Sequence, residues 1–561
     1  MTSRTHVMAV SLCLAFVAVT AARQDDAPAD LLILDGKVYA GTGDIREALA
    51  IRGDRILAVG RSQDLARLKG PRTQVMDARG RAVVPGFNDS HVHFISGGLA
   101  LQELDLAGVT TAREVQRRIL EFAERQRSEP WVRGRGWLYS PFPGGLPTRQ
   151  QLDEVVSNRP AIMTCYDGHS VWVNSKALQL AGITRATPDP ANGVIVRDPA
   201  TGEPTGVLKE SAMDLMDGVV PRPTHEDRRA ALRAAVAEAH RFGVTSIQNA
   251  GSPPEELDLY AEARRAGELK VRTYAALSIE PGFSEADAAR FDQVRRTYGE
   301  DPLFRTGIVK LYADGVIESR TAAMLAPYTG VATLGNPNYP AEDLNRIVAL
   351  MDRNGWQIQI HAIGDRAVRM ALDAFERAAA ANPRPARGRR HRLEHIETID
   401  AADIPRFKAL GVIASQQPMH VVLGDMNSER PAGPWPDNIG RARASRAWNW
   451  KSILDAGGRV TFGSDWFVAP LDPLQGVWLV STRLTPAGME SQRLSVSQAI
   501  DGYTAWPAYA SFEEQRKGVL APGMLADVVV LSRDIFARPP TTPTDVVVDA
   551  TIFDGTVVYR R

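Results

Sequence analysis

His91 and His93 form the first motif in the chain that could do chemistry, because they follow the apolar run Val83-Val84 and lie two residues apart. Side chains two apart in a β-strand leave the same face, so both imidazoles are expected to project together, with Asp89 nearby. Imidazoles and carboxylates are ligands of divalent metals such as zinc. The motif alone is also compatible with two buried histidines that hydrogen-bond to backbone carbonyls.

Three further candidate ligands stand at the ends of other apolar runs: His361, His395 and Asp465. Each is expected at the C-terminal end of a strand, which strengthens the prediction of one shared site. Lys310 lies inside a fourth run, 308–311. A charged lysine in an apolar strand is costly unless its charge is compensated or removed, so a partner or a chemical change at Lys310 is expected.

The elements that must position these residues alternate between strand and helix patterns. Expected strands lead from Val83-Val84 to His93 and then cover 244–248, 271–277, 307–311, 356–360, 391–395, 412–416 and 460–462. Helical patterns separate most of them, for example at 228–240, 254–266, 341–353, 367–379 and 402–410. No G-x-G-x-x-G motif follows the first strand, so an α/β fold of the (β/α)8 barrel type, TIM-like, is favoured over an open sheet. Active sites of such barrels lie at the C-terminal ends of the strands, where the candidate ligands stand.

Both ends of the chain contain short β-type segments with turn residues. Asp35-Gly36, Gly53-Asp54 and Asp554-Gly555 predict β-hairpins. Neither end is long enough for a buried sandwich alone, so residues 23–84 and 515–561 are expected to form one small β-sandwich module. The barrel then covers 85–514. Its segment 97–223 is far longer than an ordinary loop and is expected to fold as a cap that shapes the pocket.

The composition limits the classes of partner. The 561 residues include 66 Lys+Arg and 66 Asp+Glu, so no net charge favours nucleic acid. Arg4, the apolar run 8–19 and the small residues after it predict a signal peptide at 1–22, and therefore a secreted or periplasmic protein. The run is short for a membrane span, so no stable span is expected after cleavage, and an uncleaved anchor is the alternative. A small-molecule substrate is the expected partner, and a homo-oligomer stays open.

Several segments that contain the candidate ligands together resemble the metal signature of the amidohydrolase superfamily. The resemblance rests on 85–93, His361, 394–395 and 463–465, and on 518–523 with 526–527, which resemble the family's return into its β module. Segments 167–175, 310–315 and 320–322 are similar to amidohydrolase family 3, the subgroup that contains N-substituted formamide deformylase. The resemblance covers nearly all of the mature chain.

The resemblance implies a centre for one or two divalent metal ions, with zinc expected. His91, His93 and Asp465 would hold one ion, and His361 and His395 would hold a second. Lys310 would bridge both as a carboxylated lysine, because a neutral lysine can add carbon dioxide and become an oxygen ligand. The alternative for Lys310 is an ion pair with Asp314 or Glu318, which leaves a centre with one metal ion.

The implied chemistry is hydrolysis of a carbon–nitrogen bond, other than a peptide bond, in a small N-acyl or N-substituted amide. A divalent cation acidifies a bound water near neutral pH and polarises a carbonyl group. Asp465 would accept the proton of the water and deliver it to the leaving nitrogen. An esterase or lactonase with the same metal chemistry, and a non-catalytic metal-containing binding protein on the same fold, are the alternatives.

Four residues near the expected strand ends are candidates for substrate binding: His169, Arg320, His420 and Trp466. His169 lies in the expected cap, where it could instead hydrogen-bond within its own loop. Arg320 and Trp466 follow the fourth and eighth barrel strands, and Arg320 could instead pair with Glu318. His420 follows the seventh strand, at the mouth of the barrel.

Overall fold

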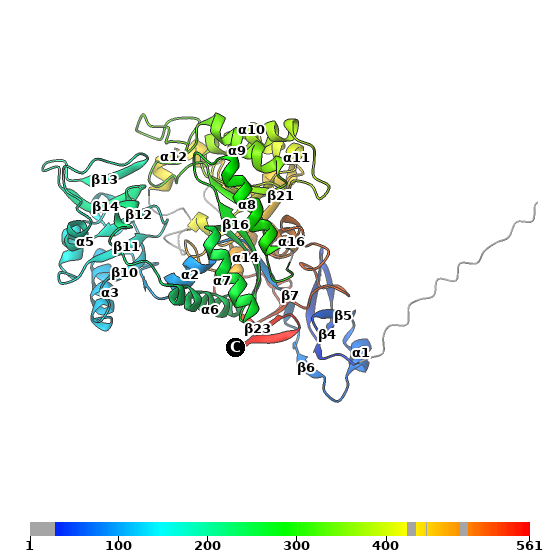
Figure 1. Cartoon of the computed structure of the whole chain (residues 1–561). Coiled ribbons are helices and arrows are strands. Elements are labelled where there is room, and N and C mark those ends of the chain that lie inside the picture. The colour runs from blue at the N-terminus through cyan, green and yellow to red at the C-terminus, as the bar shows by residue number, and fades with distance from the viewer. Residues whose placement is uncertain (1–27, 300, 423–433, 445, 483–491) are drawn as a thin grey trace, which may run out of the picture.

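The computed structural model describes residues 28–299, 301–422, 434–444, 446–482 and 492–561. A central barrel lies between a sheet-containing cap on one side and a small β module on the other (Figure 1). The predicted signal peptide at 1–22 lies outside the described residues. Within the described ranges, no helix is long and apolar enough to cross a membrane.

Eight parallel strands form the barrel, and their order in the sheet follows their order in the chain. They are β8 (Phe87–Val92), β15 (Val244–Ser252), β16 (Arg272–Ser278), β17 (Phe304–Tyr312), β18 (Gln357–Ala362), β19 (Arg392–His395), β20 (Ile413–Gln416) and β21 (Arg459–Phe462). Sequential strand order with helical crossovers is the arrangement of a TIM-like barrel. The predicted fold class is confirmed.

The first and last strands meet through backbone hydrogen bonds just beyond the end of β21. The amide of Asp465 donates to the carbonyl of His91 at 2.7 Å, and the amide of His93 donates to the carbonyl of Trp466 at 2.8 Å. The buried carboxylate of Asp89 accepts from the amides of His91 and Ser464, both at 3.0 Å. These hydrogen bonds form the seam between the first and last strands. They place Asp465 beside His91, and the Asp89 carboxylate holds the backbone of the seam in place.

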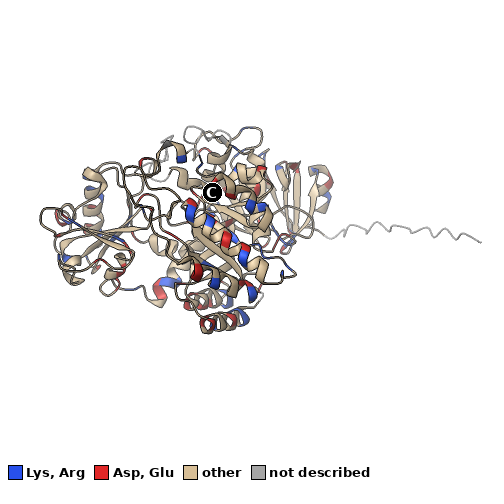
Figure 2. Ribbon diagram, turned by 90° about the horizontal axis from the view of Figure 1, so that it is seen from above, with Lys and Arg blue, Asp and Glu red and all other residues tan. Residues whose placement is uncertain are grey.

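Helices cover the outside of the barrel. Those between its strands are α6 (His225–Arg241), α7 (Pro254–Arg265), α8 (Glu285–Tyr298), α9 (Ala341–Arg353), α10 (Asp365–Ala381), α11 (Ile404–Leu410), α12 (Trp435–Ala444) and α13 (Trp450–Asp455). Capping boxes begin α6 at Thr224 and α8 at Ser284, where the side chains satisfy the first free amides. The inner faces of the helices pack with the strands into one hydrophobic core. Basic and acidic residues are interspersed along the covering helices (Figure 2).

Other helices follow the first and the last barrel strand. α2 (Phe94–Ala100) follows β8, and α14 (Pro473–Thr482), α15 (Val496–Gly502) and α16 (Ala505–Ala510) follow β21. Gly97 of α2 is essential for the local packing, because a Cβ there would lie 2.2 Å from the Trp466 ring. The indole therefore fills the space between α2 and the barrel seam.

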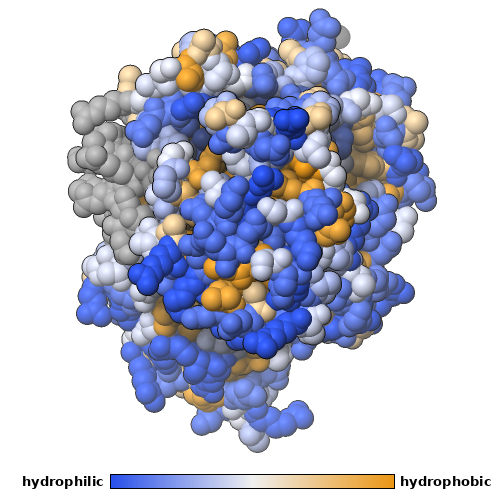
Figure 3. Space-filling model, turned by 90° about the vertical axis from the view of Figure 1, so that its left-hand side faces the viewer, coloured by the Kyte–Doolittle hydropathy of each residue, from blue (hydrophilic) through white to orange (hydrophobic). Residues whose placement is uncertain are grey.

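The segment between β8 and α6 forms a second sheet with its own core. Its strands are β9 (Leu104–Asp105), β10 (Val132–Trp137), β11 (Ala161–Cys165), β12 (Ser170–Val173), β13 (Gly193–Arg197) and β14 (Pro204–Glu210). Helices α3 (Ala112–Arg125), α4 (Arg149–Asp153) and α5 (Ser175–Leu180) accompany them. Trp137 and Trp172 are fully buried in this cap. The molecular face on the cap side is mainly hydrophilic, with hydrophobic residues in small separate areas (Figure 3).

The β module contains strands from both ends of the chain. One sheet has the order β5-β4-β1-β6 and the other the order β24-β23-β22-β7-β2-β3. The strands are β1 (Leu31–Leu34), β2 (Lys37–Gly41), β3 (Asp44–Arg46), β4 (Ala48–Arg52), β5 (Arg55–Gly60), β6 (Gln74–Asp77), β7 (Ala82–Pro85), β22 (Val528–Leu531), β23 (Val548–Phe553) and β24 (Thr556–Arg560), with α1 (Ser62–Leu65) between β5 and β6. β22 pairs with β7, so the two chain ends share one sheet.

The predicted hairpin at Asp35-Gly36 is wrong. β1 pairs with β4 and β6, whereas β2 pairs with β3 and β7, so the turn leads from one sheet to the other. Asp35 has a φ of 55°, as the sequence pattern suggested. A Cβ at Gly36 would lie 3.1 Å from both Ala78 and Val83, so the glycine also allows the close approach of the two sheets. The turn chemistry is local, but the pairing partner of each strand is decided by the module as a whole.

Candidate metal centre

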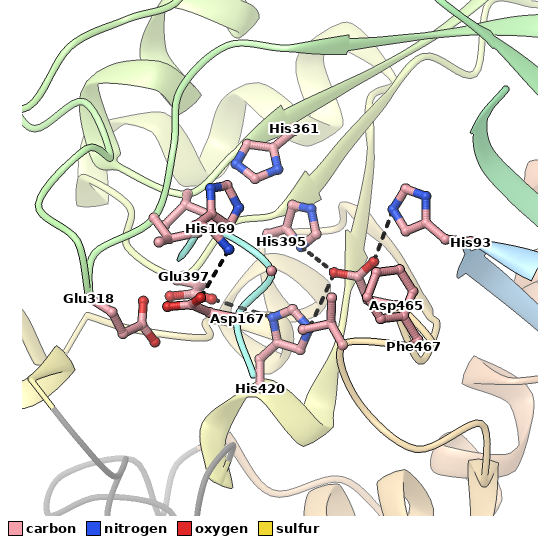
Figure 4. Close-up of a pocket in the computed structure, with 14 residues that line it drawn as sticks. His93, Asp167, His169, Glu318, His361, His395, Glu397, His420, Asp465 and Phe467 are labelled. Carbon is pink, nitrogen blue, oxygen red and sulfur yellow. Dashed lines mark hydrogen bonds and ion pairs between the residues drawn. The ribbon is translucent and has the colours of Figure 1, made fainter. Parts of the chain in front are cut away.

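Asp465 is the meeting point of a cluster of histidines at the C-terminal mouth of the barrel. Its Oδ1 lies 3.4 Å from His91 Nε2 and 3.3 Å from His93 Nε2, and its Oδ2 lies 3.4 Å from His420 Nε2 (Figure 4). His395 Nδ1 is 4.0 Å from Oδ2. Burial alone would raise the pKa of Asp465, but the surrounding histidines, with His91 foremost, hold it well below its usual range. Asp465 is therefore an ionised carboxylate surrounded by imidazoles.

Two of these residues have unusual backbone conformations. His395 has a φ of 72° and Asp465 a φ of 58°, although neither is glycine. Each stands at the end of its barrel strand, where the chain turns sharply. Such conformations are costly and are found where the surrounding structure fixes a side chain for function.

His361 lies beside His395, with 4.5 Å between the ring centres. Burial lowers the pKa of both side chains well below the usual value, so both are neutral imidazoles. The Nε2 of His361 is 3.2 Å from the carbonyl oxygen of Gly315 and 3.5 Å from Asp314 Oδ1. The structure brings His361 to the cluster, where this nitrogen lies within hydrogen-bonding distance of the Gly315 carbonyl oxygen.

Two groups of three residues each offer potential ligand atoms, and within each group these atoms all lie within 4.8 Å of one another. One is His91, His93 and Asp465, the trio expected from the sequence. The other is His395, His420 and Asp465. His361, which the resemblance placed with His395 at a second ion, is in neither group, although its ring is nearer to that of His395 than the His420 ring is, with 4.5 Å against 5.6 Å between ring centres. The sequence reasoning gave His420 as a candidate for substrate binding and not as a ligand; it belongs to a short 3-10 helix, Pro418–Val422, instead of a strand end.

The unpartnered polar atoms of the cluster fit a divalent cation. Among the described residues, its buried polar atoms without a hydrogen-bond partner are His91 Nε2, Lys310 Nζ, His395 Nδ1, His420 Nε2 and Asp465 Oδ1. Buried polar atoms are nearly always hydrogen-bonded, and each exception needs an explanation. Imidazole nitrogens and a carboxylate oxygen that converge without satisfying one another form a donor set that zinc and similar ions accept.

Glu394 orients His91 from beneath the cluster. Its Oε2 lies 2.5 Å from His91 Nδ1, and its Oε1 accepts from Arg392 Nε at 2.9 Å. All three side chains are fully buried. Burial would raise the pKa of Glu394, but Arg392 and His91 lower it to about 2. An ionised acceptor at Nδ1 keeps the proton there and leaves the Nε2 lone pair facing Asp465.

Lys310 is fully buried on β17, and its Nζ makes no hydrogen bond to the described residues. Its Nζ lies 4.3 Å from the centre of the Tyr312 ring. Burial lowers the pKa of Lys310 to about 8. The alternative, an ion pair of Lys310 with Asp314 or Glu318, is not found among the described residues. The Asp314 carboxylate accepts instead from the backbone amides of Ala323, Ile363 and Gly364.

The cap contributes His169 to the same space. Its ring centre is 6.3 Å from that of His361, and its Nδ1 lies 2.9 Å from Glu210 Oε2. Burial disfavours a charge on His169, but Glu210 more than compensates and raises the pKa to about 9. Glu210 also accepts hydrogen bonds from the barrel residues Ser319 and Thr321. Glu210 thus joins the cap histidine to the barrel, a role that the sequence reasoning missed.

A cavity of about 260 Å³ opens in front of the cluster. Its walls include histidines and Asp465 on one side, three carboxylates on another, and apolar groups: His93, Asp167, Gly168, His169, Val316, Glu318, His361, Ile363, His395, Glu397, His420, Asp465, Phe467 and Val468. His169 and His420, predicted to bind substrate, therefore line it. Burial and the neighbouring Glu397 and Asp167 raise the pKa of Glu318 to about 8.

The structure does not bring Trp466 and Arg320 to this cavity. The Trp466 indole packs on Phe94 and Gly97, and the residues that follow it, Phe467 and Val468, line the cavity instead. Arg320 is exposed, and its Nε donates to Asn438 Oδ1 at 2.8 Å. It lines a neighbouring cavity of about 570 Å³ that also includes Glu318.

Comparison with known proteins agrees with this geometry. A sequence model described as the amidohydrolase family matches residues 74–559. The protein LONG AFTER FAR-RED 3 of Arabidopsis thaliana is 33% identical over 522 residues, which cover 90% of this chain and 87% of the plant protein. N-substituted formamide deformylase of Arthrobacter pascens is 28% identical over 555 residues, which cover 95% and 98% of the two chains. The crystal structure of an uncharacterized metal-dependent hydrolase from Pyrococcus furiosus superposes with a TM-score of 0.69 at 25% identity, covering 90% of this chain and 99% of that one.

Proposed function

Because this chain belongs to the amidohydrolase family, we propose that it hydrolyses a carbon–nitrogen bond, other than a peptide bond, in a small N-acyl or N-substituted amide. The observation that carries the proposal is the convergence of His91, His93, His395 and His420 on the ionised Asp465 beside a cavity of about 260 Å³. The similarity to N-substituted formamide deformylase supports the amide as the substrate class.

The residues of the two ligand groups would hold the metal ion, for which we propose zinc. When bound, a divalent ion would polarise the amide carbonyl and lower the pKa of a water molecule. In the reaction, the water oxygen forms a bond to the carbonyl carbon and the carbon–nitrogen bond breaks, which yields a carboxylate and an amine.

We propose that Asp465 moves the proton. It is ionised, it faces the cavity, and its carboxylate reaches both ligand groups. We assign it the proton of the attacking water and then the transfer of that proton to the leaving nitrogen. His169 lines the same cavity, with its ring centre 6.3 Å from that of His361. We assign it a hydrogen bond to the substrate oxygen or to the leaving group.

The state of Lys310 is part of the proposal. A buried amine with a lowered pKa and no hydrogen-bond partner among the described residues is chemically suited to carboxylation, which would turn it into an oxygen ligand. Metal analysis together with 13C NMR after exposure to labelled bicarbonate tests this. A carbamate signal that Lys310→Met abolishes is expected, and a metal-loaded protein without that signal would argue for a plain lysine.

The test of the function is turnover of matched substrates. We expect hydrolysis of small N-formyl and N-acetyl amides, loss of activity with a chelator, and recovery with Zn²⁺. His93→Ala should abolish activity. His225→Ala is the matched control, because His225 is 59% exposed on α6 and pairs with Glu262 outside the cavity. Hydrolysis of matched esters but not of the amides would favour an esterase, and metal binding without any turnover would favour a binding protein.

We further propose that residues 1–22 direct the protein out of the cytoplasm and are removed. N-terminal sequencing of protein recovered from the periplasm or medium should then begin near Arg23. A protein that retains Met1 in the cytoplasmic fraction would contradict this.

A further inference from the structure

One wall of the cavity in front of the histidines is acidic. Figure 4 shows Asp167, Glu318 and Glu397 gathered on one side, with His93 and Asp465 on the other. None of the described residues that line this cavity is lysine or arginine. Its two histidines with a raised pKa already have carboxylate partners other than Glu318: His169 pairs with Glu210, and His420 lies between Glu397 and Asp465. The proposed reaction, as described so far, gives this group of carboxylates no role.

Two of the three carboxylates are already satisfied by the protein. Asp167 accepts from the Tyr139 hydroxyl at 2.8 Å and from the His169 amide at 3.0 Å. Glu397 accepts from the Trp435 indole at 2.7 Å and lies 3.4 Å from His420 Nδ1. These groups have fixed structural partners in the wall.

Glu318 differs from the other two. Its side-chain hydrogen bond among the described residues is a long one, 3.4 Å from the Tyr166 hydroxyl. Glu318 lines both the cavity in front of the histidines and the larger cavity beside it, so its side chain belongs to the wall that the two cavities share. A half-buried carboxylate beside two others is unfavourable unless a cation or a hydrogen-bond donor joins it.

We propose that the substrate carries a cationic N–H donor, such as an ammonium group, on its N-substituent, and that Glu318 binds this group while the amide lies against the histidines. The inference rests on the proposed amide hydrolysis and names the class of amide. Charged hydrogen bonds of this kind are short and strong in a partly desolvated site. The leaving amine would therefore be a small diamine or a similar polyamine.

The shape of the cavity agrees with this assignment. A volume of about 260 Å³ admits a short chain, and Val316, Ile363 and Val468 supply apolar wall for its methylene groups. Amides whose substituent ends in a free carboxylate, such as N-acyl amino acids, would place a negative charge against Glu318. They are expected to be poor substrates.

The first test uses the unmodified, metal-loaded enzyme and three N-formyl amides of similar length. Their N-substituents end in an ammonium, a methyl or a carboxylate group. We expect kcat/KM to fall in that order, with roughly 10- to 100-fold between the ammonium and methyl compounds, the range of one charged hydrogen bond. Equal kcat/KM values, or a preference for the carboxylate, would overturn the proposal while leaving amide hydrolysis intact.

The second test compares two charge-neutralising variants. Glu318→Gln should raise KM for the ammonium amide roughly 10- to 100-fold and remove the preference over the methyl amide. Asp437→Asn is the matched control, since it removes an exposed carboxylate from the neighbouring cavity. The control should keep the preference. The same loss in both variants would show a general electrostatic effect and contradict a specific role of Glu318.

Binding measured without turnover separates this inference from the proposed function. Calorimetric titration with propylammonium should show binding that Glu318→Gln weakens at least tenfold, whereas 1-propanol should not bind measurably. If no amide is hydrolysed but propylammonium binds through Glu318, the proposed function fails and the donor site stands. If propylammonium binds equally to both proteins, the donor site is refuted.

Discussion

Replacing Glu394 with glutamine should weaken metal binding although Glu394 is not a ligand. Glu394 accepts the Nδ1 proton of His91 through Oε2, at 2.5 Å, and the Nε proton of Arg392 through Oε1, at 2.9 Å. Glutamine has one acceptor oxygen for these two donors. If that oxygen stays with Arg392, the amide NH2 group faces Nδ1, and His91 must move its proton to Nε2. The nitrogen that faces Asp465 would then have no lone pair for a metal.

The magnitude follows from the role of such supporting carboxylates. Loss of the group that orients a metal-binding histidine costs about 10- to 100-fold in metal affinity, or roughly 1.4 to 2.7 kcal/mol of binding free energy. The fold should survive, because Arg392 keeps hydrogen bonds to the Ser90 carbonyl, the Ser415 hydroxyl and Gln248. We expect a loss of about 1–3 kcal/mol in the free energy of unfolding, the cost of one weakened buried hydrogen bond.

Competition with a chromogenic chelator measures the metal affinity, and urea unfolding measures the stability. The control is Asp352→Asn, which disturbs a second buried histidine–carboxylate pair, 3.0 Å between Asp352 Oδ1 and His391 Nε2, away from the cavity. The control should lose stability but keep its metal affinity. If Glu394→Gln binds zinc within twofold of the unmodified protein, the reasoning about the His91 proton is refuted.

Three further predictions concern other parts of the molecule. Asp465→Asn should retain bound metal but lose turnover at least about 100-fold, whereas His91→Ala should lose both bound metal and turnover. Metal analysis together with an activity assay measures this. An active Asp465→Asn enzyme would refute the proposed proton transfer by Asp465. Gly97→Ala would place a Cβ 2.2 Å from the Trp466 ring, so urea unfolding should show a loss of about 1–3 kcal/mol in the free energy of unfolding. The control is Gly218→Ala, which has nothing within 4 Å of its Cβ and should change the free energy of unfolding by less than about 0.5 kcal/mol. Equal effects of the two variants would contradict the packing argument. Glu210 raises the pKa of His169 to about 9. The free energy of unfolding that this pair contributes is therefore complete below the unfolded pKa of about 6.5 and is lost as the pH rises through about 9. Glu210→Gln should lower the free energy of unfolding by about 1–3 kcal/mol at pH 6 and by much less at pH 10, and an equal loss at both pH values would show that His169 is not charged.

Local patterns in the sequence predicted most of the barrel. The strand candidates at 244–248, 307–311 and 391–395 lie within or overlap β15, β17 and β19, because apolar runs and their flanking turns depend on near neighbours. The hairpins at Gly53-Asp54 and Asp554-Gly555 join β4 to β5 and β23 to β24. The same signal at Asp35-Gly36 failed, because the partner of a strand is chosen by packing across the whole module.

The site divides in the same way. His91, His93, His395 and Asp465 were predicted to share a centre because each ends a barrel strand, and the ends of parallel strands meet at one rim. His420, Glu394 and Glu210 act through contacts with residues distant in the chain, and no spacing in the sequence signals such contacts. Trp466 was predicted to contact substrate because it follows Asp465 in the chain, but its side chain does not line the cavity. A position next to a candidate ligand does not determine where the side chain points.

The sequence by itself determined the type of fold and the chemical type of the centre, because strand periodicity and ligand chemistry are properties of single segments. Only the tertiary structure decided which nitrogen of His91 faces Asp465, that His420 joins His395 and Asp465 in one group, and that Glu318 accepts a long hydrogen bond from Tyr166. Those outcomes depend on distances of a few ångströms between segments that meet only when the barrel closes and the cap packs over it.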